Sequence, residues 1–230
     1  MTPSQAEGKL PTVASDWRCQ IATQHVPQGD EDRPIIILLG GVSGTGKTTV
    51  GNLLVEEMGL SHHISTGFLR AAIGHLLPEP EAKLLQRHTY DAYQELNGHV
   101  PDGRSLLMEG AFQQSTLLRP GIESCIKRAL REGIGMVLEG SHFIPGAIDP
   151  ASSGAHLLCI LDVPDREELK HRALSPNHSR RRLSEEQLAR LFQLQDEILE
   201  MARAHGQPVV LNDDLPSAVA EVRNLVAARA

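Results

Sequence analysis

The stretch GVSGTGKT, Gly41 to Thr48, decides the fold of this 230-residue chain. It fits in full the pattern G-x-x-x-x-G-K-[ST], a glycine-rich loop that joins a strand to a helix. The run IIILL, Ile35 to Leu39, precedes it and is continuously apolar, as in a strand buried on both faces. An amphipathic helix is expected to follow to about Met58, where Gly59 can end it. This order of elements predicts a phosphate-binding loop.

The chemistry of such a loop assigns a role to each of its residues. The glycines let backbone N–H groups turn inward around phosphate oxygens, and the helix N-terminus adds a positive dipole end. We expect Lys47 to reach the β and γ phosphates of ATP, and Thr48 to hold Mg²⁺. The predicted nucleotide-binding residues are Gly41, Ser43, Gly44, Thr45, Gly46, Lys47, Thr48 and Thr49.

From Pro34 onward strands and helices alternate, which argues for a parallel sheet with helices on both faces. Residues 1–33 are polar and aperiodic and are interpreted as an N-terminal extension. Residues 34–230 are expected to form one α/β P-loop NTPase domain of five strands, similar to nucleoside monophosphate kinases, with sheet order 2-3-1-4-5. The further expected strands are HHIS, GMVLE, HLLCILDV and PVVLN, and the further expected helices cover 66–77, most of 78–132, a segment after Pro164, 184–204 and a segment from about Asp214.

Composition restricts the class of protein. The net charge of −7 argues against a general nucleic-acid binder, so an anionic ligand needs a local cluster of positive groups. No apolar run approaches the ~18 residues that span a membrane, and the N-terminus has no signal-peptide features. Cys19, Cys125 and Cys159 are far apart and form no paired motif, so we interpret them as reduced thiols of a cytoplasmic protein, with Cys125 in the core.

A switch GTPase would need a D-x-x-G after a strand and an N-K-x-D for guanine, and neither pattern occurs in the sequence. A small-molecule kinase is therefore the better interpretation. The stretch ISTGFLR, Ile64 to Arg70, resembles the acceptor-binding element of adenylate kinases, with Phe68 in place of its acid. Thr66 and Arg70 lie one helical turn apart and can face one pocket, where a guanidinium suits an anionic acceptor.

A second arginine-rich stretch, SPNHSRRR, lies between two expected helices. P-loop kinases carry a closing lid at this place, expected here at about 174–183, whose arginines neutralise the charge that moves between donor and acceptor. We place Arg180 and Arg182 in substrate binding and Arg181 in catalysis, although the sequence does not decide which of the three acts. His178 is expected to be a surface residue.

The stretch VLEGSHFIPG, Val137 to Gly146, places Glu139 at the carboxyl end of a buried strand, where ligands of parallel sheets bind. Two roles fit this carboxylate. It can orient a water molecule on Mg²⁺, or it can take the proton from an attacking hydroxyl group. His142, in the adjoining loop, fits either an acceptor-binding role or a structural one.

The segment from Phe112 to Gly133, followed by LEGSHFIPG, resembles the 2-phosphoglycerate kinase family over roughly residues 34–212. The resemblance implies ATP-dependent phosphorylation of 2-phosphoglycerate to 2,3-bisphosphoglycerate, with Glu139 and His142 as active-site positions. Three features depart from the family. Residues 1–33 are too few for the N-terminal regulatory domain of archaeal members, Gly67 replaces a frequent acid after IST, and Ser141 takes an apolar position.

These departures keep the acceptor open beyond a small anionic metabolite. A nucleoside monophosphate kinase remains the enzymatic alternative, and a non-catalytic nucleotide-binding regulator remains the non-enzymatic one. The missing acid leaves Glu139 as the best remaining base. The sequence does not give the oligomeric state, and it predicts neither a nucleic-acid nor a membrane partner.

Overall fold

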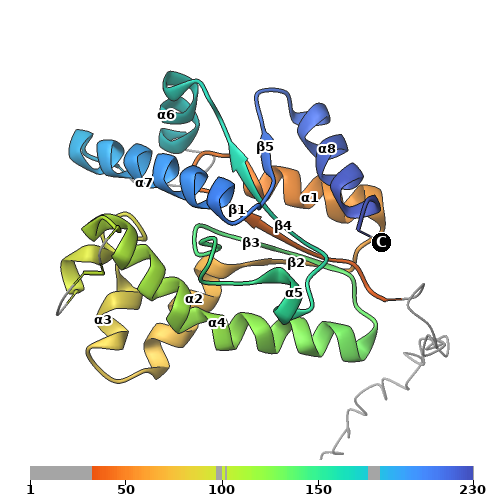
Figure 1. Ribbon diagram of the computed structural model, residues 1–230, viewed down its shortest axis with the longest axis horizontal. Helices are drawn as coiled ribbons and strands as arrows, with labels where there is room; N and C mark the ends of the chain where they lie inside the picture. Colours follow the sequence, from red (N-terminus) through yellow and green to blue (C-terminus); the bar gives the residue numbers. More distant parts are fainter. Residues whose placement is uncertain (1–32, 97–99, 102, 176–181, 230) are drawn as a thin grey trace, which may run out of the picture.

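The protein is described by a computed structural model that covers residues 33–96, 100–101, 103–175 and 182–229. Its centre is a five-stranded parallel sheet with strand order β2-β3-β1-β4-β5 (Figure 1), which confirms the predicted 2-3-1-4-5 order. The strands are β1 (Ile36–Gly40), β2 (His62–Ser65), β3 (Met136–Glu139), β4 (Leu157–Asp162) and β5 (Val209–Leu211). The first strand starts and ends one residue later than the pattern predicts.

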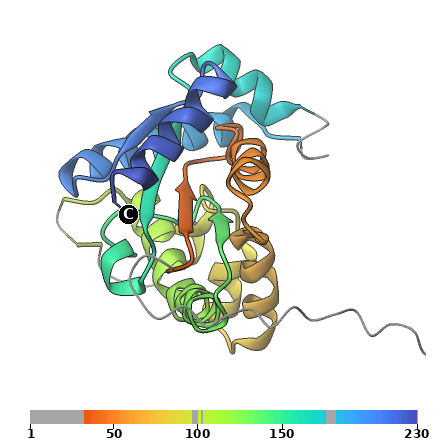
Figure 2. The same ribbon diagram turned by 90° about the vertical axis from the view of Figure 1, so that its right-hand side faces the viewer.

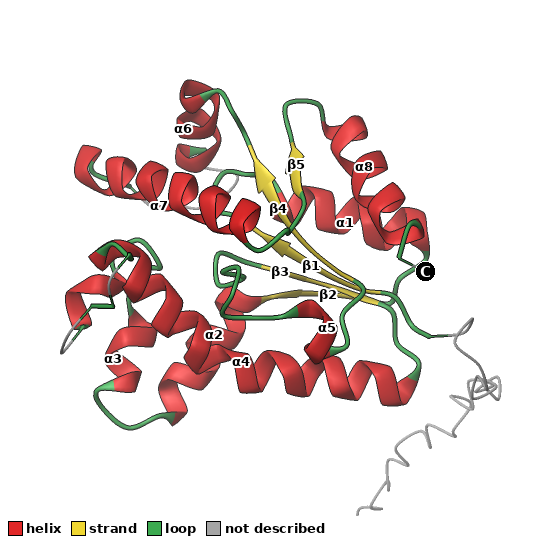
Figure 3. Cartoon of the chain, in the orientation of Figure 1, coloured by secondary structure: helices red, strands yellow, loops and turns green. Residues whose placement is uncertain are grey.

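Helices cover both faces of the sheet, as the buried central strands require (Figure 3). The pleat sends Ile37 and Leu39 of β1 into the apolar cluster under α1 (Lys47–Met58) and α8 (Leu215–Ala227). The alternate residues Ile36 and Leu38 enter the larger cluster, which includes residues of α4 (Leu106–Glu132) and α7 (Glu185–Ala204). All five residues of β1 are buried, because layers of helices lie on both of its faces.

The segment between β2 and β3 is largely helical, as predicted. It contains α2 (Thr66–Leu76), α3 (Glu81–Gln86), the short 3-10 helix η2 (Ala92–Glu95) and α4. The remaining helices are α5 (Pro150–Ser153), which the pattern did not predict, and α6 (Arg166–Leu174). In Figure 2 this helical segment lies on one side of the sheet, away from α1 and α8.

Local signals in the sequence set several helix boundaries. Ser184 accepts a hydrogen bond from the backbone N–H of Gln187, whose side chain accepts one from the backbone N–H of Ser184, so the two residues form a capping box at the start of α7. Gly59 and Gly133 end α1 and α4 in the left-handed conformation. Cys125 is half-buried against the larger apolar cluster, as expected of a core position.

Two expectations fall largely or wholly outside the described residues. The N-terminal extension lies there except for Arg33, whose guanidinium donates a hydrogen bond to the backbone oxygen of Gly154. Most of the expected lid, with His178, Arg180 and Arg181, lies there as well. Within the described part of the chain, no helix has the length and apolar character needed to cross a membrane.

Candidate active site

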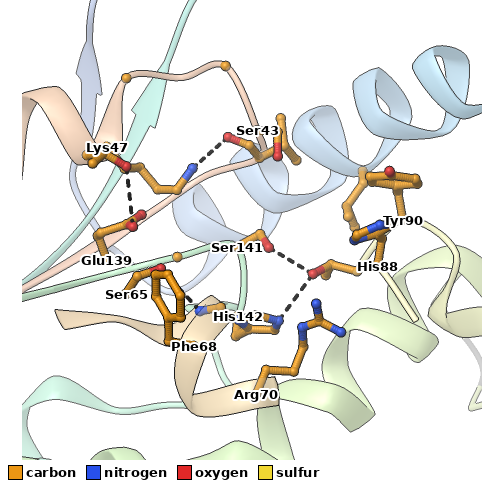
Figure 4. A pocket seen from close by; sticks show the side chains of 18 of the residues that line it. Ser43, Lys47, Ser65, Phe68, Arg70, His88, Tyr90, Glu139, Ser141 and His142 are labelled. Carbon is orange, nitrogen blue, oxygen red and sulfur yellow. Dashed lines mark hydrogen bonds between the residues drawn. The ribbon is translucent and has the colours of Figure 1, made fainter. Parts of the chain in front are cut away.

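The carboxyl ends of β1, β2 and β3 open onto a cavity of about 560 Å³ (Figure 4). The phosphate loop forms one wall, the start of α2 and the segment His88 to Tyr90 form another, and the end of β3 forms the floor. This is where ligands are expected to bind in an open parallel sheet.

Lys47 lies in the phosphate-loop wall and is 7% exposed. Its Nζ donates to the backbone oxygen of Val42 at 2.7 Å and to Oγ1 of Thr45 at 3.4 Å. Burial lowers the pKa of Lys47, and the nearby charge of Glu139 opposes that shift. A phosphate group would favour the charged ammonium further, so the loop is arranged to gain a charge-assisted contact when an anion binds.

Glu139 ends β3 beside Leu39 of β1 and Ser65 of β2, at the predicted edge of the sheet. It is 6% exposed, and its Oε1 lies 3.4 Å from Oγ1 of Thr48. The two residues that the sequence proposes for the metal are therefore neighbours in space. Among the described residues there is no group of three or more His, Cys, Asp or Glu side chains able to hold a metal ion.

Two oxygen ligands still suit Mg²⁺, because this ion usually keeps several waters and completes its shell with substrate phosphates rather than with a protein cage. Thr48 and Glu139 would hold it, Glu139 directly or through water. Bound there, the ion would neutralise charge on the β and γ phosphates.

Two buried amides that no sequence motif indicated support the phosphate loop. Gln195, on α7 and fully buried, accepts from the backbone N–H of Val42 at 3.0 Å and donates to the backbone oxygen of Leu161 at 3.0 Å. Asn212, just after β5, donates to the backbone oxygen of Thr45 at 2.9 Å. A Cβ on Gly46 would lie 2.1 Å from Nδ2 of Asn212, so this close approach explains the glycine.

Thr66 does not line the cavity as the sequence interpretation expects. It is fully buried, and its Oγ1 lies 2.8 Å from Nδ1 of His142. A Cβ on Gly140 would come within 1.7 Å of that same hydroxyl oxygen, so the glycine after Glu139 makes room for Thr66. Thr66 therefore supports the floor of the cavity from behind.

His142 does line the cavity, although it is only 3% exposed. Burial lowers its pKa to about 3, and the positive charges of Arg70 and Lys47 act in the same direction. The imidazole is therefore neutral near pH 7. A neutral ring can donate one hydrogen bond and accept another, but it offers no full charge to an anionic acceptor.

Arg70 lies on α2 beside His142, as the views of both side chains in Figure 4 show. Its Nη1 donates to the backbone oxygens of Leu85 and, at 2.6 Å, of Arg87. The guanidinium is thereby held in place at the wall of the cavity. Phe68, two residues before it, is 82% exposed at the rim of the same cavity.

The segment His88 to Tyr90 is the part of the cavity that sequence reasoning missed. His88 and Tyr90 stack with ring centroids 5.4 Å apart, and Thr89 lies between them with its Oγ1 2.8 Å from Oγ of Ser141. The only local hint was the cluster of polar and aromatic residues in RHTYD, which matches no phosphate or acceptor motif. The sheet topology, rather than spacing in the sequence, brings it to the site.

A partly buried ion pair anchors this segment to α7. Asp91 is 7% exposed and accepts from Nη2 of Arg190 at 2.8 Å, from Nε of Arg190 at 3.1 Å and from Gln187 at 3.0 Å. The helix that supports the phosphate loop through Gln195 thus also holds the opposite wall of the cavity.

Of the three lid arginines, only Arg182 is described; it is exposed and does not line the cavity. Arg172, at the end of α6, pairs with Glu168 at 2.7 Å and donates to the backbone oxygen of Asn212 at 2.8 Å. The roles assigned to Arg180, Arg181 and Arg182 stay predictions.

Comparison with known proteins gives no match to any protein-family model. The chain is 28% identical to a 2-phosphoglycerate kinase of Pyrococcus horikoshii over 192 residues, which cover 82% of this chain and 63% of that protein. It is 29% identical to a 2-phosphoglycerate kinase of Methanothermobacter thermautotrophicus over 195 residues, 81% of this chain and 63% of that protein. The aligned part thus spans less than two thirds of these relatives.

A solved sugar kinase from Janibacter sp. HTCC2649 superposes with a TM-score of 0.50 at 18% identity, covering 84% of this chain and 95% of that one. This likeness concerns the fold, and it agrees with the predicted P-loop kinase architecture. The resemblance that the segment Phe112 to Gly133 and the block from Glu139 to Gly146 indicated is confirmed: the chain is similar in sequence to the 2-phosphoglycerate kinases.

Proposed function

We propose that the protein transfers the γ-phosphoryl group of ATP to a small anionic metabolite, with 2-phosphoglycerate as the first candidate. One observation carries the proposal. A single cavity has the phosphate loop with Lys47 and Thr48 on one side and Arg70 and Ser141 on the other, with Glu139 between them. The two relatives are 2-phosphoglycerate kinases, which supports the same acceptor.

The donor side would act through position and charge. The loop N–H groups and Lys47 would hold the β and γ phosphates, and Thr48 and Glu139 would hold Mg²⁺. Lys47 is already directed into the loop by its contact with the backbone oxygen of Val42, so binding exchanges one oxygen partner for another.

The acceptor side would orient a hydroxyl group toward the γ phosphorus. The guanidinium of Arg70 would hold the acceptor's anionic group, since the two backbone oxygens keep its orientation. Glu139 is the sole acidic residue among those lining the cavity in the described part of the chain. Where Glu139 does not serve the metal, it is the available base for the hydroxyl proton, as the new O–P bond forms and ADP leaves.

The test is an acceptor screen that measures ADP release and product mass, with 2-phosphoglycerate, 3-phosphoglycerate, glycerate and nucleoside monophosphates compared at equal concentration. We expect 2-phosphoglycerate to accelerate ADP release far above slow hydrolysis of ATP alone. A nucleoside monophosphate as the best acceptor would contradict the proposed acceptor class. Acceleration by none of a broad panel of phosphorylated acids, nucleotides and sugars would contradict catalysis and favour a nucleotide-binding regulator.

Lys47→Ala supplies the matched negative control for that screen. Loss of the point charge on the β and γ phosphates should abolish transfer while the thermal unfolding curve stays cooperative. Lys127→Ala, on an exposed position of α4, should leave turnover unchanged. Turnover that survives in Lys47→Ala would exclude the kinase interpretation.

A further inference from the structure

Four polar side chains form a hydrogen-bonded chain from the interior to the cavity, in the order Thr66, His142, Thr89 and Ser141. We infer that this chain holds the Ser141 hydroxyl as a hydrogen-bond donor to an anionic oxygen of the acceptor, with Thr66 as a positioning residue at its buried end. The inference rests on the proposed function. It adds Ser141 as a residue that selects acceptors with a carboxylate or phosphate group near the reacting hydroxyl.

Two contacts of ordinary hydrogen-bond length and a longer, weaker one between His142 and Thr89 join the four side chains. Oγ1 of Thr66 lies 2.8 Å from Nδ1 of His142, and Nε2 of His142 lies 3.4 Å from Oγ1 of Thr89. Oγ1 of Thr89 lies 2.8 Å from Oγ of Ser141, a residue that is partly exposed and lines the cavity. The first three side chains are buried, so water does not readily replace any of these contacts.

The direction of the chain follows from its buried end. Within the described part of the protein, the hydrogen-bond partner of the Thr66 hydroxyl is His142. If Nδ1 donated to Thr66, the hydroxyl proton would be buried without an acceptor, which is costly. The favoured arrangement therefore has Thr66 donating to Nδ1, which leaves the proton of the neutral ring on Nε2.

The donors and acceptors of the remaining hydrogen bonds then follow. Nε2–H of His142 donates to Thr89. Within the described residues the buried Thr89 hydroxyl has His142 and Ser141 as its hydrogen-bond partners, so its own proton goes to Ser141. The lone pairs of Ser141 thus receive a hydrogen bond from within the protein, and its own proton points to the cavity. Because burial lowers the pKa of His142 to about 3, the ring is neutral near pH 7, and these donor and acceptor roles hold there.

Ser141 adjoins Glu139 through one glycine, and its side chain faces the same cavity as the Arg70 guanidinium (Figure 4). An acceptor whose anionic group contacts Arg70 can therefore also receive the Ser141 hydrogen bond. A hydroxyl donor suits an oxygen anion, and it gives no comparable gain to an uncharged sugar, whose own hydroxyl groups find equal partners in water.

The first test is a double-mutant cycle with 2-phosphoglycerate, measuring both KM and calorimetric Kd. Ser141→Ala should weaken 2-phosphoglycerate binding by about 10- to 100-fold, the usual loss for a hydrogen bond to a charged group. Thr66→Val, which keeps the shape but removes the hydroxyl, should weaken it by roughly three- to tenfold in the parent and by nothing further in Ser141→Ala. Thr66→Ser should restore binding, and KM for ATP should hardly change.

Additive losses in the cycle would show that Thr66 acts on packing alone and would overturn the positioning role. Unchanged binding in Ser141→Ala would overturn the specificity role. Thr116→Val, on the exposed side of α4, is the matched control, because its hydroxyl is not part of the hydrogen-bonded series. This substitution should change neither KM nor Kd for 2-phosphoglycerate.

The second test needs no turnover. Protein labelled with ¹⁵N-histidine should show a pyrrole-type Nε2 and a pyridine-type Nδ1 for His142, assigned by the signals lost in His142→Gln. The opposite tautomer would overturn the inference. If the wild-type protein binds 2-phosphoglycerate through Ser141 but does not phosphorylate it, the proposed function fails and the inference stands. If it binds neither 2-phosphoglycerate nor inorganic phosphate, the role of Ser141 is overturned.

Discussion

The hydroxyl oxygen of Thr48 and Oε1 of Glu139 lie 3.4 Å apart, although 91 residues separate them in the chain. The phosphate loop brings the first, and the carboxyl end of β3 brings the second. A contact at this distance is weak, so a metal ion or a water molecule can take its place with little loss. Glu139 is therefore free either to serve the metal or to take the proton of the acceptor hydroxyl.

Glu139→Gln separates those two roles. If Glu139 takes the proton from a hydroxyl acceptor, we expect kcat to fall by about 10²- to 10⁴-fold with ATP affinity largely retained. If Glu139 serves the metal, the loss should be accompanied by a changed Mg²⁺ dependence. The measurement is kcat across a Mg²⁺ titration with the acceptor found in the screen. Recovery at high Mg²⁺ would contradict the base, and full activity under all conditions would contradict both roles.

Gln195→Leu should lower stability and ATP affinity, although Gln195 itself does not line the cavity. The change leaves the backbone N–H of Val42 and the backbone oxygen of Leu161 without their buried partner, and each such loss costs about 1–3 kcal/mol. We expect a free energy of unfolding lower by about 2–4 kcal/mol and a raised KM for ATP, measured by urea unfolding and steady-state kinetics.

Gln193→Leu provides the matched control for this change. Gln193 lies on the same helix, but it is exposed, and within the described residues its side chain hydrogen-bonds to Glu197. Its substitution should change the free energy of unfolding by less than about 0.5 kcal/mol. Equal effects of the two substitutions would contradict a specific support of the loop by Gln195.

The fold was predictable because its signals are local or follow strong packing rules. The strand before Gly41, the capping box at Ser184 and the glycine that ends α1 each depend on a few adjacent residues. The strand order 2-3-1-4-5 came from analogy with nucleoside monophosphate kinases, and the parallel sheet from alternation of elements. The same local signals placed Glu139 at the carboxyl end of a strand.

The rest of the site depends on contacts between distant segments, and these leave no pattern in a single sequence. Thr89 meets Ser141, and Gln195 meets Val42, because the sheet order and the packing of α7 bring them together. Thr66 was predicted to face the cavity from its helical spacing relative to Arg70. Its hydroxyl instead lies behind the floor of the cavity, close to Gly140. The spacing of residues along one helix does not predict such a contact with another segment.

Arg70→Ala tests the acceptor side. If the guanidinium holds the acceptor's anionic group, KM for the acceptor should rise about 10-fold or more, while KM for ATP changes little. Arg70→Lys should recover only part of the loss, since an ammonium cannot hold two backbone oxygens and a bidentate anion in one plane. Arg128→Ala, an exposed arginine of α4, is the control. Equal rises for both substrates would remove Arg70 from the acceptor subsite.

His142 predicts a specific pH dependence of stability. Its pKa in the folded protein is about 3, whereas an unfolded histidine titrates near 6.5. The unfolded chain therefore binds a proton at this position between those values and the folded chain does not. The free energy of unfolding should fall as the pH decreases from about 6.5 toward 3, at up to roughly 1.4 kcal/mol per pH unit from this residue.

His142→Gln removes that titration, so its stability should decline less steeply than that of the wild-type protein when urea unfolding is compared at pH 7, 6 and 5. Near pH 7 the variant should be the less stable of the two, because glutamine does not reproduce the contacts with Thr66 and Thr89. The two curves should therefore converge as the pH falls. His171→Gln, on an exposed position of α6, should keep the wild-type slope. Parallel curves for wild type and His142→Gln would show that His142 is protonated in the folded protein as readily as in the unfolded chain, and the neutral ring would have to be given up.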